Sequence, residues 1–502
     1  MAKTASKEDI YAVIDLGSNS FHMLIAKHMT GGIQTIGRVK RKVRLASGLD
    51  DQNELSLEAM QRGWECLALF AERLQDIPKR NVSIVATATL RLAINADRFI
   101  AKAEQILGHK VNVISGEVEA KTIYKGVAHT SSCQGKQLVI DIGGASTEVV
   151  IGKGFDALLY ESLNMGCVTY LDRYFSDGLL SKANFDAAEN AAAKVIKPIQ
   201  GDYKKLGWEL AIGASGTVQA IQEIFAAMGE SEQLTLSKLE EVKYKAIACN
   251  TIAALDLPGL IEERRLVFVS GLAILIALCK SLEIQAMGLA GGALREGVLY
   301  SMIPDFQAVD ICQRTLDGFT QRYHVDNEQA LRVYEVVSDI VAQVSHAWEL
   351  DEQNCLHLAK AIASLHEIGL LIDYKQYHRH SGYILANTAM PGYSKAQKDI
   401  IVAVVKNHRA DLLAKDFEKL GCHLDYAKLL CVVVRLGVLL SMRRKDDVLP
   451  KVGVTTSKIE KKSLTMQLPE SWLSLHPLML AELTQEAAYL SKFGWELKIE
   501  RI

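Results

Sequence analysis

Two short segments rich in Asp, Gly and Ser follow apolar stretches and have the composition of phosphate-binding loops. The first reads DLGSNS over residues 15–20, and the second reads DIGGASTE over residues 141–148. An Asp at a strand end can hold a magnesium ion through water, while Gly and Ser bring backbone N–H groups and hydroxyls against phosphate oxygens. A single match of this kind is more often a β-turn with a structural Asp, but two copies one small α/β domain apart favour a phosphate-binding pair. The predicted phosphate-binding residues are Gly17, Ser18, Asn19, Ser20, Gly143, Gly144 and Ser146, with Asp141 and Asp15 as magnesium ligands.

Two further glycine-rich turns lie in the same half of the chain. They read GASGT over residues 213–217 and GLAGGALREG over residues 288–297, and each precedes a helical pattern. Free N–H groups at a helix N-terminus bind anions, although tight strand-to-helix packing explains such glycines equally well. From the first turn we expect phosphate contacts by Gly213, Ser215, Gly216 and Thr217.

Up to about residue 300, the elements that must position these loops alternate between predicted strands and helices, which is typical of an α/β fold. Short apolar runs that end in Gly or a turn alternate with helical patterns: YAVIDLGSNS, SIVATAT, VNVIS, QLVIDIGGAS, ELAIGASGT and QAMGLAGGALREG. After about residue 305 strand signals vanish for roughly 140 residues, and helical patterns take over. The segment from about residue 451 reads as a small α+β tail around one helix.

Composition narrows the class of protein. A chain of 502 residues is too long for one hydrophobic core, and a net charge of −2 gives no overall attraction for nucleic acid or acidic lipid. The nine cysteines form no Cys-x-x-Cys pair, which indicates a reducing compartment. The first ten residues lack a signal-peptide core, and the apolar stretch 266–279 is too short to span a bilayer and is interpreted as a buried helix. We therefore expect a cytoplasmic protein without nucleic-acid or membrane partners.

Six motifs in order resemble the exopolyphosphatase and guanosine pentaphosphate phosphohydrolase family, within the actin and sugar-kinase superfamily. They read YAVIDLGSNSFHMLI, VATATLRLA, VISGEVEA, LVIDIGGASTEVV, NMGCVTYLDRYF and LAGGALREG, and the phrases VATATLRLA and RKVRLASGL favour the guanosine pentaphosphate branch. The resemblance implies two actin-like (ribonuclease H-like) domains at 1–126 and 127–305. It also implies an all-α His-Asp-like domain at 306–447 and a small α+β domain at 448–502, with Mg²⁺ as cofactor and a homodimer as the assembly.

The same resemblance gives roles to residues that local patterns leave open. Glu119 becomes the carboxylate that activates water, with Glu148 as its partner, whereas the residues alone favour Glu117 and Glu119 as acids at the start of an exposed helix. Arg91 and Arg264 are expected to bind phosphate oxygens, since Arg makes bidentate phosphate contacts. The segment 38–44 has five basic residues in seven, and both an anion-gathering strip and a charged edge strand fit it.

The helical part carries a set of residues spaced like the metal ligands of His-Asp phosphohydrolases. His366, Glu367, His380 and His408 match that spacing, but Gln329 stands where the first His is needed and Val438 where the last Asp is needed. With about half the ligands lost, we expect no binuclear centre and a retained scaffold.

Three functions fit these residues. The first is removal of the terminal phosphate from guanosine pentaphosphate, giving the tetraphosphate, with inorganic polyphosphate as the alternative or additional substrate. The second is a sugar or acetate kinase, for which the sequence offers no acceptor pocket or base of its own. The third is a non-catalytic sensor, which the intact carboxylates at Glu119 and Glu148 disfavour.

Overall fold

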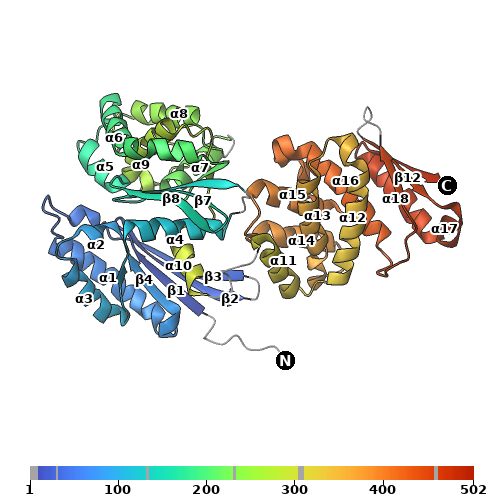
Figure 1. The fold of residues 1–502 in the computed structure, drawn as a ribbon, viewed down its shortest axis with the longest axis horizontal. Helices are drawn as coiled ribbons and strands as arrows, with labels where there is room; N and C mark the ends of the chain where they lie inside the picture. The colour runs from blue at the N-terminus through green and yellow to red at the C-terminus, as the bar shows by residue number, and fades with distance from the viewer. Residues whose placement is uncertain (1–9, 30–31, 132–134, 230–232, 304–309, 457–461) are drawn as a thin grey trace. The chain divides into compact units, whose positions relative to one another are not determined.

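The computed structural model describes residues 10–29, 32–131, 135–229, 233–303, 310–456 and 462–502 (Figure 1). It divides into two compact units, which are described separately. Unit 1 comprises residues 1–29 and 33–309, and unit 2 comprises residues 30–32 and 310–502. The start of the chain, the expected 305/306 boundary and part of the expected α+β tail fall outside the described residues.

Unit 1 contains two five-stranded sheets with the same strand order. The first sheet has the order β3-β2-β1-β4-β5, and the second, read from its β8 edge, has the order β8-β7-β6-β9-β10. In each, the central strand pairs antiparallel with the next strand in sequence and parallel with a later one. The strands are β1 Ile10–Leu16, β2 Ser20–Met29, β3 Gly32–Lys42, β4 Val82–Ala86, β5 Asn112–Val113, β6 Lys136–Ile142, β7 Thr147–Lys153, β8 Asp156–Leu163, β9 Leu210–Gly213 and β10 Gly288–Leu289.

The repeated strand order confirms that the α/β region consists of two like halves. Each of the six apolar runs identified in the sequence contains a strand of the structure, and these strands are β1, β4, β5, β6, β9 and β10. Serine caps start several of the helices, because a serine hydroxyl accepts a hydrogen bond from an N–H of the first turn. The helices of unit 1 are α1 Leu57–Leu74, α2 Ala88–Leu92, α3 Ala96–Leu107, α4 Gly116–Ala128, α5 Cys167–Tyr174, α6 Lys182–Leu206, α7 Gly216–Ala227, α8 Leu236–Ala248, α9 Glu262–Leu282 and α10 Leu294–Met302.

Helix α4 lies between the two sheets and packs against α10 (Figure 1). Two glycines make this contact close: a Cβ on Gly126 would lie 2.0 Å from the Ala293 oxygen, and a Cβ on Gly297 would lie 1.9 Å from the Thr122 oxygen. Larger side chains at either position would separate the helices. The contact therefore fixes the C-terminal half of α4 against the N-terminal end of α10, which also contacts the first sheet.

Helix α9 is the core helix expected around residues 266–279, but it is longer than the apolar run because polar residues extend both ends. Its 21 residues, with a mean hydropathy of 1.9 over the most apolar window, are enough to cross a membrane by length and composition. The expectation that this segment is too short is thus wrong. Of that window 72% is buried within the protein, as in the core helix of a folded domain.

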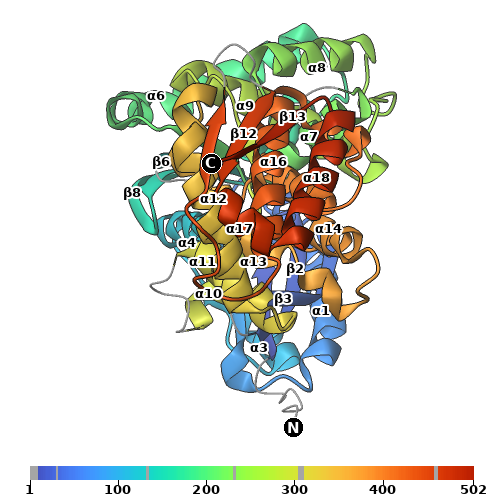
Figure 2. The same cartoon turned by 90° about the vertical axis from the view of Figure 1, so that its right-hand side faces the viewer.

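Unit 2 is helical up to residue 440 and ends in a small sheet. The strand order β11-β12-β13 pairs β12 antiparallel with β11 and parallel with β13. In Figure 2 helix α18 lies along this sheet, and it packs on β13. The elements are α11 Ile311–Arg322, α12 Asn327–Trp348, α13 Glu352–Leu365, α14 Tyr377–Asn387, α15 Lys395–Asn407, α16 Leu424–Leu440, β11 Gly453–Thr456, β12 Ser463–Leu468, α17 Glu470–Leu475, α18 Pro477–Lys492 and β13 Glu496–Arg501.

Candidate active site

The two predicted phosphate loops occupy equivalent turns, one between β1 and β2 and the other between β6 and β7. They lie against each other, since a Cβ on Gly144 would be 2.9 Å from the Ser18 Cβ and 3.2 Å from the Asn19 nitrogen. Glycine at position 144 is what permits this approach. The structure therefore brings the two copies of the motif into a single site.

Each loop is tightened by its own backbone. Gly143 donates its N–H to the Ser146 oxygen at 2.9 Å, and a Cβ on Gly143 or Gly17 would lie 2.9 Å from the carbonyl oxygen three residues later. The side chains of Ser18, Ser20 and Ser146 are buried, and the Ser20 hydroxyl has no hydrogen-bond partner in the part of the chain that the structure describes. A buried hydroxyl without a partner is available to an entering ligand atom.

Asp15 and Asp141 stand near the ends of β1 and β6 in a region poor in solvent. Burial raises the pKa of Asp15 to about 6, and the positive charge of Arg295 opposes that rise. Burial, followed by the negative charges of Glu148 and Asp15, raises the pKa of Asp141 to about 7. Carboxylates that repel one another in a desolvated site favour a bound cation. Among the described residues no three His, Cys, Asp or Glu side chains converge on one point, so any Mg²⁺ here would need water or phosphate oxygens as further ligands.

Glu119 and Glu148 form the second acidic pair. Glu119 is 6% exposed on the first turn of α4, whose N-cap is Ser115, and it accepts a hydrogen bond of 3.0 Å from Arg91. Burial, and then the charge of Glu148, raises the pKa of Glu119 to about 9. Burial also raises the pKa of Glu148, while hydrogen bonds from Ser162, at 2.7 Å, and Ser146 lower it. Two carboxyl groups with such raised pKa values are characteristic of sites that move protons.

The rival carboxylate, Glu117, is exposed on the same helix, so burial and charge coupling single out Glu119. Arg91 is held by a second hydrogen bond, at 2.8 Å, to the Ile114 oxygen immediately before α4. Its guanidinium is thereby fixed beside Glu119, with three N–H groups left after these two bonds.

The loop at 213–217 borders the start of α7. The Ser215 hydroxyl caps this helix, Thr217 packs against Gly271 of α9, and Gly216 lies against the guanidinium of Arg264. A Cβ on Gly216 would lie 2.1 Å from Arg264 Nη1. The glycine thus leaves room for the arginine beside free N–H groups at a helix N-terminus, which is an anion-binding arrangement.

Basic side chains from three elements meet near these loops. Lys40 of β3 is exposed, and within the described ranges neither it nor Arg264 has an ion pair. Partial desolvation, followed by the charges of Arg264, Lys42 and Arg295, lowers the pKa of Lys40 to about 8, and Glu263 opposes this shift. Lys42 donates to the Glu263 oxygen at 2.6 Å, which ties β3 to the start of α9. The carboxylate of Glu263 offsets part of this positive charge, so the cations outnumber the acids acting on Lys40, which favours an anion nearby. The charges acting on Lys40 bring this residue of the strip 38–44 near Arg264 and Arg295, and whether the strip gathers anions stays a prediction.

Arg295, at the start of α10, was not singled out by the sequence. Arg295 Nη1 lies 2.7 Å from His22 Nδ1, so the imidazole is neutral and accepts from the guanidinium. Burial, followed by the charges of Arg295, Lys40 and Arg264, lowers the pKa of His22 to about 2. The following Glu296 caps α10 at the Ala293 nitrogen, 3.0 Å away.

Comparisons with known proteins agree with this geometry. The model of the Ppx/GppA phosphatase family matches residues 24–306, and that of Ppx/GppA phosphatase domain III matches residues 311–487. The chain belongs to the Ppx/GppA phosphatase family. Guanosine-5'-triphosphate,3'-diphosphate pyrophosphatase of Pseudoalteromonas translucida is 63% identical over 99% of both chains, and the enzyme of that name from Vibrio cholerae is 49% identical over the same shares.

Solved structures give the same family. An exopolyphosphatase from Cytophaga hutchinsonii has a TM-score of 0.54 and 25% identity, covering 58% of this chain and 97% of that one. The Aquifex aeolicus PPX-GPPA enzyme has a TM-score of 0.50 and 22% identity, covering 58% and 99%, which supports the fold of the first part of the chain. The α/β architecture expected from the sequence is thus confirmed as that of Ppx/GppA proteins.

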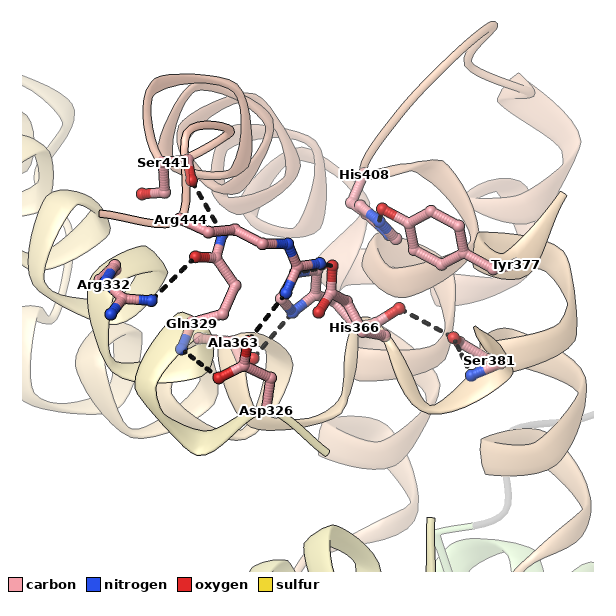
Figure 3. Close-up of polar contacts among 12 residues, drawn as sticks. Asp326, Gln329, Arg332, Ala363, His366, Tyr377, Ser381, His408, Ser441 and Arg444 are labelled. Carbon is pink, nitrogen blue, oxygen red and sulfur yellow. Dashed lines mark hydrogen bonds and ion pairs between the residues drawn. The ribbon is translucent and has the colours of Figure 1, made fainter. Parts of the chain in front are cut away.

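The His-Asp-like residues of unit 2 lie together but lack metal-binding geometry. Gln329 donates to the Ser441 oxygen at 2.9 Å, so its amide is used structurally (Figure 3). The ring of His408 lies near those of His366, Tyr377 and His378, with 5.2, 5.4 and 6.0 Å between centroids, whereas the sequence pattern selected His380. Nowhere in the described ranges do three His, Cys, Asp or Glu side chains form a metal-binding group. That unit 2 is a scaffold without a binuclear centre stays a prediction.

Proposed function

We propose that this Ppx/GppA family member hydrolyses the terminal phosphoanhydride of guanosine 5'-triphosphate 3'-diphosphate. The observation that carries the proposal is the joining of Glu119, Glu148 and Arg91 to two facing phosphate loops in one unit. The activity for which relatives up to 63% identical are named supports this substrate. Inorganic polyphosphate is the second candidate, because it presents the same terminal anhydride and relatives of solved structure are named exopolyphosphatases.

In this proposal Glu119 orients the attacking water and accepts its proton, with Glu148 sharing the charge of the acidic pair. Arg91 and Arg264 bind equatorial phosphate oxygens through their free N–H groups. The glycine-rich loops at 15–20, 141–148 and 213–217 hold the remaining oxygens by backbone N–H groups and by the hydroxyls of Ser18, Ser20 and Ser146. This division supplies orientation and charge stabilisation, the two contributions that phosphoryl transfer needs.

Asp15 and Asp141 are proposed to hold Mg²⁺. The fit rests on their raised pKa values in a desolvated site and on oxygen-only donors, which Mg²⁺ prefers. When bound, the ion would neutralise charge on the phosphate oxygens. A homodimer in the cytoplasm, without nucleic-acid or membrane partners, completes the proposal.

The test is a comparison of phosphate release. The purified protein is incubated with Mg²⁺ and either guanosine pentaphosphate or polyphosphate, with and without acetate or a sugar as acceptor. We expect free phosphate from the pentaphosphate at a rate unaffected by acceptor. Transfer of phosphate to the acceptor would show that the protein is a kinase instead. Binding of the substrate without turnover would show that it is a sensor.

A further inference from the structure

Ser162 of β8 stands in line with two acidic side chains of the site. It lies directly opposite Glu148 across β7 and β8, and Glu148 lies opposite Asp141 across β6 and β7. Residues directly opposite each other in antiparallel strands point to the same face of a sheet. The row of Asp141, Glu148 and Ser162 therefore crosses three strands on one face, and its outer member is a hydroxyl where the other two are carboxyl groups.

The hydroxyl of this serine is bonded to the buried carboxyl group beside it. Ser162 Oγ donates to Glu148 Oε1 at 2.7 Å, and Glu148 is 2% exposed. A hydrogen bond to an ionisable group in such a place is stronger than one between neutral groups, and it restricts the orientation of that group. Ser146 donates a second hydrogen bond to Glu148, so the carboxyl group keeps one partner when Ser162 is lost.

Ser162 also contacts the helix that carries Glu119. Helix α4 packs on β7 and β8 (Figure 1), and its first residue, Gly116, lies against Ser162. A Cβ on Gly116 would lie 2.5 Å from the Ser162 Cβ, 2.8 Å from Ser162 Oγ and 3.7 Å from Arg91 Nη2. Glycine at position 116 is what lets the hydroxyl stand here. Ser162 thus lies where Glu148, the first turn of α4 and the arginine that donates to Glu119 come together.

We propose that Ser162 is a positioning residue for hydrolysis, which holds the carboxyl group of Glu148 in the orientation in which it acts together with Glu119. This role rests on the proposed function, in which these two carboxyl groups form the pair that activates water. Ser162 itself binds no phosphate oxygen, since those oxygens are assigned to the glycine-rich loops and to Arg91 and Arg264. Its loss should therefore slow the chemical step and leave substrate binding nearly unchanged.

The test is steady-state hydrolysis of guanosine pentaphosphate with Mg²⁺ by the full-length variant Ser162→Ala. We expect its kcat to fall about tenfold to hundredfold, the factor that one hydrogen bond to a charged group supplies, while KM changes by less than about threefold. Glu161→Ala is the matched control, because the neighbouring side chain is exposed and pairs with Val149 instead of the acidic row, and it should resemble wild type. Ser162→Cys, which keeps the size of the side chain but donates only weakly, replaces the alanine variant if that one does not fold.

A double-mutant cycle separates positioning from a general loss of structure. Because Ser162 acts through Glu148, adding Ser162→Ala to Glu148→Ala should lower kcat by less than about twofold beyond the loss caused by Glu148→Ala alone. A further tenfold loss in that background, a rise in KM as large as the fall in kcat, or an unchanged kcat in Ser162→Ala would overturn the role of Ser162 and leave the proposed function in place. No phosphate release by wild type would overturn the proposed function, and the role of Ser162 with it.

Discussion

Replacing Glu119 by Gln should stabilise the protein at neutral pH while it removes catalysis. The pKa of Glu119 is raised from 4.5 to about 9 by burial and by Glu148. Between these values the folded chain holds a proton on Glu119 that the unfolded chain has released. The stability contributed by the protonated form is therefore complete below pH 4.5 and is lost as pH rises to about 9. At pH 7 the free energy of unfolding has fallen by at most about 3 kcal/mol from its value below pH 4.5, since one pKa unit is about 1.4 kcal/mol. The value is an upper one because Glu148 shares the effect through charge coupling.

The assay compares thermal unfolding midpoints of wild type and Glu119→Gln from pH 5 to pH 8. Glutamine stays neutral, so the midpoint of the variant relative to wild type should rise steadily with pH, while phosphate release falls about 10²-fold or more. Glu117→Gln is the matched control, because that carboxylate is exposed on the same helix and should change neither quantity. A difference between wild type and Glu119→Gln that does not depend on pH, or near-normal turnover in Glu119→Gln, would refute the assignment.

Four further outcomes are expected. The kcat/KM of wild type should rise with pH toward about 9, because Glu119 must lose its raised-pKa proton before it accepts one from water; a profile flat from pH 6 to 9 would contradict this. Replacing Lys40, Arg41 and Lys42 by Gln should weaken the binding of long polyphosphate more than that of guanosine pentaphosphate, and it should flatten the salt dependence of binding. An equal loss of binding for both ligands would indicate only a charged edge strand. Mg²⁺ and substrate together, on Glu119→Gln, should compact the protein in small-angle scattering and slow hydrogen exchange in both phosphate loops; compaction by Mg²⁺ alone would rule out closure on the substrate. Gly297→Val should lower kcat at least tenfold by separating α10 from α4, and normal activity in a stable variant would show that this contact does not position the site.

The loops were predictable because their signal is local. Asp15 to Ser20 and Asp141 to Glu148 carry strand, turn and hydroxyl residues within eight positions, and the turn between two paired strands keeps them together. Arg295 and Ser162 were not predictable in this way. Each reaches the site from a distant segment, α10 or β8, and a lone Arg or Ser carries no periodic signal. Burial around Arg295 and the hydrogen bond from Ser162 to Glu148 become visible only in three dimensions.

In unit 2 the limits of spacing arguments are equally clear. The pattern selected His380, but α14 begins at Tyr377 and its turn places His378 against His408. A shift of two positions on a helix changes the face by about 200°. The ion pair of Arg444 with Glu367 lacked any signal, because it depends on a backbone reversal after α16 that brings the arginine side chain back to Glu367.

The duplicated sheets explain why a symmetric scaffold has an asymmetric site. Asp15 pairs across β1 and β2 with His22, and Asp141 pairs at the equivalent position of β6 and β7 with Glu148. The first partner is a neutral imidazole that accepts from Arg295, whereas the second is a buried carboxyl coupled to Glu119. Both halves therefore offer a phosphate loop and an Asp, but only the second adds a group that can share a proton with a catalytic carboxylate. In the proposed mechanism both halves hold phosphate and the side of Glu148 activates water, so His22→Glu would place a further acid beside Asp15 and should weaken phosphate binding rather than double the activity.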